Sequence, residues 1–245
     1  MEKAIEIRTA DGTADGFLCA PEGSGSWPGI IQLTDIHGVR PVARDLAKRI
    51  AAKGYVVLLP NVFYRTGKAP LPDFTFKPGD EKAMARFREL AGPLTADAME
   101  RDGGAYVDFL AKQAGARPGK MGVVGYCFTA AMAMRTAAAR PERIVAVAGF
   151  HGGRLFTSDS TSPHTILARI KARFYFGHAT DDHSMPKESI EKFEQALRAW
   201  GGKFESETYD GAHHGWTQPD MPAYNEPAAE RAFEKLIELF DATLK

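Results

Sequence analysis

The feature that most constrains the fold is a series of short apolar runs that alternate with longer amphipathic segments along the chain. Runs such as VVLL and VVG are apolar at consecutive positions, a pattern typical of strands buried on both faces and hence of a parallel sheet covered by helices. The runs predict strands at Ala4–Arg8, Ala14–Ala20, Gly29–Thr34, Tyr55–Leu59, Lys120–Gly125, Ile144–Gly149, Arg173–Gly177 and Lys203–Tyr209.

The amphipathic segments between these runs have the length and spacing of helices. In one of them Ile190, Phe193 and Leu197 recur three and four positions apart, which places them on one helix face. The Asp11-Gly12 pair between the first two strands is typical of a hairpin turn. The sequence therefore predicts an α/β fold with a mostly parallel sheet, helices on both faces and an antiparallel leading hairpin. Helices are expected at Val42–Lys53, Glu81–Ala91, Thr95–Gln113, Phe128–Ala139, Pro186–Trp200 and Glu226–Thr243.

Length and charge limit the class of protein and of partner. The chain has 245 residues, which suits one α/β domain over residues 1–245. Lysine plus arginine equals aspartate plus glutamate at 31 each, so no excess charge favours nucleic acid or an anionic membrane as a partner. We therefore expect a small molecule as the partner, no nucleic acid or membrane, and a monomer or homodimer.

The N-terminus and the cysteine count predict a cytoplasmic protein. Charged residues stand where a secretory signal would have its apolar core. No apolar run approaches the ~20 residues that span a bilayer. The two cysteines, Cys19 and Cys127, are too few for a disulfide scaffold, and in the cytoplasm a thiol stays reduced and usable.

Cys127 lies where a buried strand turns into a helix. A side chain on such a turn stands at the carboxyl edge of the sheet, beside the free N–H groups of the helix. Those groups favour the reactive thiolate, and the N–H of Phe128 can donate to a developing oxyanion. A lone cysteine is more often a small buried side chain. The turn reads G-x-C-x-T, because Thr129 stands where glycine is usual.

An acid and a histidine follow later strands in the order expected for an α/β-hydrolase triad. Cys127, Asp182 and His214 keep the order nucleophile, acid, base, each after a strand at the same sheet edge. Asp181 and His213 are the rival choices. Asp182 is favoured because Pro186 opens the next helix soon afterwards, and His214 because a Gly-Trp pair follows it.

Two other interpretations compete with a triad. The side chains of His178, Asp182, His183, His213 and His214 could ligate a metal, but no recognised metal spacing is present, so no metal is expected. Cys127 could also act as a redox-responsive thiol, but no cysteine lies close by in the sequence to resolve it.

Two long segments without helical periodicity are expected to lie on the substrate side. They are Asn61–Asp80, which is rich in proline and aromatic residues, and Gly152–Pro163, which is polar and rich in turn residues. Loops of this length in a compact domain are often lids or substrate walls.

Over nearly its whole length, from Ile5 to Phe240, the chain resembles the dienelactone hydrolases (carboxymethylenebutenolidases). The resemblance lies in LTDIHGVRPVARDLAKRIAAKGYVVLLPN, VVGYCFT, FHGG, HATDDHSMP and YDGAHHGW. It implies a cysteine hydrolase of enol-lactones or related esters that uses no cofactor, with Cys127, Asp182 and His214 as its triad.

The resemblance also implies roles for residues around the triad. The backbone N–H of Ile36 would be the second oxyanion donor. Asp35 stands where the family has a glutamate that supports the thiol. Gln218 replaces a basic residue that grips the substrate carboxylate, which argues against dienelactone itself as substrate. His37, Arg86, Phe150, His151 and Trp216 are candidates for the pocket, with Arg88 the alternative to Arg86.

The expected function is therefore hydrolysis of a lactone or small carboxylic ester through a thioacyl-enzyme. The alternative is a non-catalytic homologue that binds a small ligand or partner, since Thr129 and Asp35 both depart from the family pattern.

Overall fold

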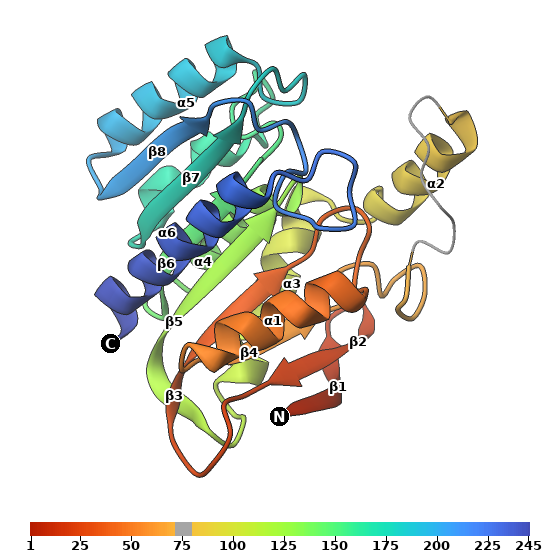
Figure 1. Cartoon of the computed structure of the whole chain (residues 1–245), viewed down its shortest axis with the longest axis vertical. Coiled ribbons are helices and arrows are strands. Elements are labelled where there is room, and N and C mark those ends of the chain that lie inside the picture. The colour runs from red at the N-terminus through yellow and green to blue at the C-terminus, as the bar shows by residue number, and fades with distance from the viewer. Residues whose placement is uncertain (72–79) are drawn as a thin grey trace.

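The computed structural model describes residues 1–71 and 80–245, and in them the predicted strands and helices occur in the predicted order (Figure 1). The strands are β1 Glu2–Thr9, β2 Gly12–Cys19, β3 Trp27–Leu33, β4 Val56–Pro60, β5 Ala116–Tyr126, β6 Ile144–Phe150, β7 Arg173–Ala179 and β8 Phe204–Tyr209. The helices are α1 Pro41–Ala52, α2 Glu81–Ala91, α3 Ala96–Leu110, α4 Thr129–Ala139, α5 Lys187–Trp200 and α6 Glu226–Leu244, with a short 3₁₀ helix, η1, at Pro163–Arg169.

The strands form one eight-stranded sheet in the order β1-β2-β4-β3-β5-β6-β7-β8. The pairs β1·β2 and β2·β4 are antiparallel, and every later pair is parallel. This confirms the α/β fold with an antiparallel leading hairpin.

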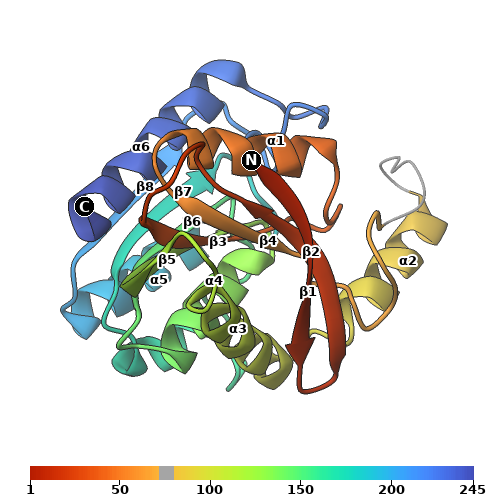
Figure 2. The same cartoon turned by 90° about the horizontal axis from the view of Figure 1, so that it is seen from below.

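Helices cover both faces of the sheet (Figure 2). Helices α1 and α6 pack on one face, while α3, α4 and α5 lie on the other, and each face has its own apolar core. Helix α2 projects from the body of the molecule (Figure 1). Burial of the central strands on both faces explains their continuous apolar runs.

The strand order reverses direction at β3. The next strand in sequence, β4, lies on one side of β3, while β5 lies on the other, in register with Leu33 opposite Gly125. The loops that leave β3 and β5 therefore diverge from neighbouring points at the carboxyl edge, which is where ligands bind in open parallel sheets. This switch point brings the segment after Leu33 close to Cys127.

Two features depart from the sequence-based expectations. Strand β5 begins at Ala116 instead of Lys120, because residues 117–120 are exposed and lack an apolar signal. Helix η1 lies within a stretch without helical periodicity. The segment Asn61–Asp80 is described only in part, since residues 72–79 lie outside the described residues. None of the described helices has the length and apolar character needed to cross a bilayer.

Candidate active site

Cys127 occupies a sharp turn between β5 and α4. Its φ angle is +58°, in the left-handed region that few non-glycine residues adopt, and its N–H donates to the carbonyl of Phe150 at 3.1 Å. Gly125 must precede it, because a Cβ at that position would lie 2.2 Å from the carbonyl oxygen of Thr129. The turn therefore holds the cysteine in a strained conformation at the end of a buried strand.

Thr129 stabilises this turn with its hydroxyl. The side chain is fully buried, and its Oγ1 accepts a hydrogen bond from the N–H of Tyr126 at 3.0 Å and donates to the Tyr126 carbonyl at 2.9 Å. The same oxygen lies 3.4 Å from the carbonyl of Leu33, at the end of β3. The hydroxyl bridges the ends of β3 and β5 where the two strands separate, so threonine supplies contacts that glycine could not.

The structure brings Cys127, His214 and Asp182 together in one chain of contacts. Nε2 of His214 lies 3.1 Å from Sγ of Cys127, and Nδ1 lies 2.6 Å from Oδ2 of Asp182. The other oxygen of Asp182 accepts from the N–H and the hydroxyl of Ser184, at 2.8 and 2.7 Å. The neighbours Asp181 and His213 are exposed. An imidazole held in this way can remove a proton from the thiol.

Electrostatics favour a positive charge on His214. Burial lowers its pKa, but the hydrogen bonds with Asp182 and Cys127 and their negative charges raise it more, to about 10. Burial raises the pKa of Asp182, yet its hydrogen bonds with His214 and Ser184 lower it further. His151 lies edge-on to His214 with a ring separation of 5.0 Å, and burial together with the charge of His214 lowers its pKa to about 3. His151 is therefore neutral near pH 7.

A cavity of about 420 Å³ opens beside Cys127 and His214. One wall is apolar and includes Leu94, Met99 and Phe128. Further lining residues come from the segment after β6, which includes residues of the predicted substrate-side loop 152–163, and from α4. A pocket of this size suits a small organic substrate.

Two backbone N–H groups at the carboxyl edge of the sheet are candidates to bind a substrate oxygen. Neither the N–H of Ile36 nor that of Phe128 donates a hydrogen bond within residues 1–71 and 80–245. Ile36 follows β3 and Phe128 precedes the first turn of α4, so both lie where the two loops diverge. Such donors can stabilise an oxyanion.

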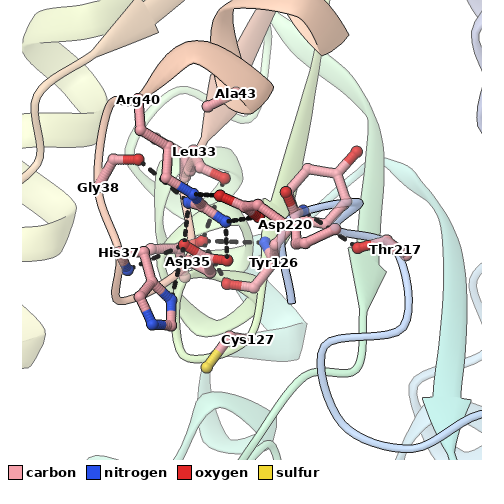
Figure 3. Close-up of polar contacts among 12 residues, drawn as sticks. Leu33, Asp35, His37, Gly38, Arg40, Ala43, Tyr126, Cys127, Thr217 and Asp220 are labelled. Carbon is pink, nitrogen blue, oxygen red and sulfur yellow. Dashed lines mark hydrogen bonds and ion pairs between the residues drawn. The ribbon is translucent and has the colours of Figure 1, made fainter. Parts of the chain in front are cut away.

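Asp35 contacts an arginine that sequence reasoning did not select (Figure 3). Its two carboxylate oxygens accept from Nη1 and Nη2 of Arg40 at 2.7 and 3.0 Å, and one also accepts from the N–H of His37 at 2.9 Å. Burial raises the pKa of Asp35, but these hydrogen bonds and the charge of Arg40 lower it well below the usual range. In Figure 3 the thiol of Cys127 points away from this carboxylate.

Arg40 also reaches the loop that follows His214. Its Nε and Nη2 donate to the carboxylate of Asp220 at 2.6 and 3.0 Å (Figure 3). Arg40 thus joins the loop that carries Ile36 to the loop that carries His214. No sequence motif marks an arginine that lies just before a helix. The only sequence signal for this ion pair was the presence of acidic residues in the two loops.

The other residues predicted for the pocket lie around His151 and on or against α2. Trp216 and Phe150 are fully buried, and the ring of Trp216 packs against that of His151. Nε2 of His151 lies 2.8 Å from the hydroxyl of Thr217. His37 packs edge-on to Phe87 on α2, with a ring separation of 5.5 Å. Arg86 forms an ion pair with Glu89 on α2, at 2.7 Å.

Gln218 lines a different cavity, of about 180 Å³ between α1 and α6. Its amide nitrogen donates to the hydroxyl of Thr217 at 3.1 Å. His178 is buried and contacts the hydroxyl of Ser206 at 3.1 Å. In the described part of the chain, no three histidine, cysteine or acidic side chains group in a way that could hold a metal ion.

Comparison with known proteins supports the fold. A protein from Klebsiella pneumoniae assigned to the dienelactone hydrolases superposes with a TM-score of 0.86 at 22% identity, over 98% of each chain. The dienelactone hydrolase-like promiscuous phosphotriesterase P91, from metagenomic libraries, superposes with a TM-score of 0.79 at 20% identity, over 100% of this chain and 99% of its own. At these identities the likeness concerns the fold, which is that of the α/β-hydrolases.

Sequence similarity identifies the family. The carboxymethylenebutenolidase of Rhodococcus opacus is 32% identical over 233 residues, which cover 93% of this chain and 86% of that protein. The model of the dienelactone hydrolase family matches residues 14–244. The chain belongs to the dienelactone hydrolase family, as its sequence predicts.

Proposed function

We propose that this protein hydrolyses lactones or small carboxylic esters with Cys127 as nucleophile. The observation that carries the proposal is the unbroken contact chain from the thiol through His214 to Asp182, at 3.1 and 2.6 Å. Membership of a family that includes a carboxymethylenebutenolidase supports lactones and related esters as the substrate class.

In the first step the proton of Cys127 moves to Nε2 of His214, and the thiolate attacks the substrate carbonyl carbon. The carbonyl oxygen takes the electron pair, and the N–H groups of Ile36 and Phe128 stabilise the resulting oxyanion. The raised pKa of His214 supports this charge separation, because it favours the imidazolium form beside a thiolate.

The tetrahedral intermediate then collapses to a thioester. The bond to the alkoxy oxygen breaks, and the imidazolium of His214 donates its proton to that oxygen. An ester releases an alcohol at this point, whereas a lactone keeps its hydroxyl attached to the acyl group. Water, deprotonated by His214, attacks the thioester, and collapse of the second intermediate releases the acid and restores the thiol of Cys127.

The two cysteines of the chain provide the test and its matched control. Cys127→Ala should lower kcat on aryl esters and on unsubstituted lactones at least about 10³-fold, as expected for loss of a nucleophile. Cys19→Ala should keep near-normal turnover, because Cys19 is buried in the sheet and burial raises its pKa to about 11. Wild-type turnover that persists in Cys127→Ala, or no turnover of any ester or lactone by the wild type, would contradict the proposal.

A further inference from the structure

A buried arginine lines the candidate catalytic cavity. Arg135 lies on α4 and is 6% exposed, and it shares the cavity with Cys127 and His214. Charged side chains are seldom buried to this extent without a partner of opposite charge. The partners of Arg135 therefore decide what this charge does.

No carboxylate within the described ranges forms an ion pair with Arg135. Its Nη2 donates to the backbone carbonyl of Thr161, in the loop after β6, and no described residue accepts from Nε or Nη1. The charges of Glu100 and Asp97 raise the pKa of Arg135, but Glu100 is bonded to Arg169 and Asp97 is exposed. Burial lowers the pKa of Arg135, as expected for a cation without a counterion.

A second arginine of the cavity shows the contrast. Arg154 has a side chain that is 72% exposed, and its Nη2 lies 3.1 Å from Oδ2 of Asp159. The charge of Arg154 is therefore solvated and is neutralised by Asp159. Of these two arginines, Arg135 is the one whose guanidinium is buried in the cavity lining. It also has N–H groups that donate to no described residue.

Helix geometry sets the distance between this charge and the reacting carbonyl. Phe128, Ala131 and Arg135 line the cavity from one side of α4. At 1.5 Å per residue, the backbone of Arg135 lies roughly 10 Å along the helix from the oxyanion donor of Phe128. Side chains lean toward the helix N-terminus, which brings the guanidinium part of the way back. An anion on Arg135 would lie roughly 5–10 Å from the carbonyl carbon.

We propose that Arg135 is a specificity-determining residue that binds a terminal carboxylate of the substrate, at the end of an extended acyl chain. The inference rests on the proposed hydrolysis and adds the substrate class to it. A carboxylate would supply the counterion that the buried guanidinium lacks, through charge-assisted hydrogen bonds. Gln218 has no part in this recognition, because it lines the cavity between α1 and α6.

The test compares substrates that differ only in the terminal charge. One series contains p-nitrophenyl half-esters of linear dicarboxylic acids from succinate to suberate, and the other contains the same compounds with the free carboxylate methylated. Wild type should favour the charged series about 10-fold or more in kcat/KM. Arg135→Met should lower kcat/KM about 10- to 100-fold on the charged series, mainly through KM, and less than about 3-fold on the neutral one.

Arg198→Met is the control, since it removes an exposed arginine of α5 that is paired with Glu194 and lies outside the cavity, and it should change both series by less than about 3-fold. Arg135→Lys keeps the charge and should retain an intermediate preference, which covers the case in which Arg135→Met folds poorly. Equal losses on both series in both Arg135 variants, or no preference in wild type, would overturn the inference and leave Arg135 as a support of the loop at Thr161.

Binding separates this inference from the proposed function. Calorimetry with Cys127→Ala should show that a dicarboxylate such as adipate binds more tightly than hexanoate, and that adding Arg135→Met removes the difference. Such binding without hydrolysis in wild type would refute the catalytic proposal alone. Hydrolysis that depends on Cys127 but shows no dependence on Arg135 would refute the present inference alone.

Discussion

Replacing Thr129 by valine should damage the turn that holds Cys127, because valine has the same shape but no hydroxyl. The N–H of Tyr126 now donates to Oγ1 at 3.0 Å in a fully buried site, and in Thr129→Val this donor loses its partner. An unsatisfied buried donor costs about 1–3 kcal/mol. In a chain of this length that cost corresponds to a decrease in Tm of about 2–12 °C, at about 2–4 °C for each kcal/mol.

Thermal unfolding followed by circular dichroism measures this decrease, and Thr129→Ser is the matched control because it keeps the hydroxyl. We expect Thr129→Ser to recover most of the lost Tm, and ester turnover to fall more in Thr129→Val, since Cys127 at φ +58° depends on this turn for its strained conformation. A Thr129→Val protein as stable as wild type, or a Thr129→Ser protein as unstable as Thr129→Val, would refute the bridging role of the hydroxyl.

Two further perturbations concern the charged groups around the site. The pKa of His214 is raised from 6.5 to about 10, so its protonated form stabilises the fold fully below pH 6.5, and this contribution is lost as the pH rises toward 10. Asp182→Asn should flatten the fall of Tm between pH 6.5 and 10, and an unchanged slope would contradict the coupling. Arg40→Gln leaves the buried carboxylate of Asp35 unpaired and should destabilise by about 3–5 kcal/mol in urea unfolding. Asp220→Asn, at the half-exposed end of the same contact, should cost about 1 kcal/mol or less, and equal effects would argue against a buried ion pair.

The centre of the sheet could be predicted because each of its central strands carries a local signal. Burial on both faces demands apolar residues at consecutive positions, and runs such as Val123-Val124 satisfy this condition within a few residues. The proximity of Asp182 and His214 could be expected for a related reason. Parallel strands end at one edge, so residues that follow them meet in space whatever their separation in sequence.

The role of Asp35 could not be predicted from its neighbours in sequence. Its expected place beside the thiol came from a glutamate in related proteins, and aspartate is one methylene shorter. The structure pairs it with Arg40, whose second partner Asp220 is 180 positions away. Sequence separation of this kind leaves no local pattern, because the pair forms only when the loops after β3 and β8 meet. The carboxylate therefore orders the loop of Ile36 through the arginine.

Arg135 shows why a nucleophile is easier to propose from sequence than a substrate. The turn at Cys127 is defined by residues that are adjacent in sequence, and its chemistry follows from a strand end and a helix start. Arg135 is an ordinary arginine within a helix, and such residues usually point into solvent. It is buried because the loop after β6 crosses α4 and places the carbonyl of Thr161 on the guanidinium. The charge proposed to select the substrate thus depends on a tertiary contact, whereas the thiol proposed as nucleophile depends on a local turn.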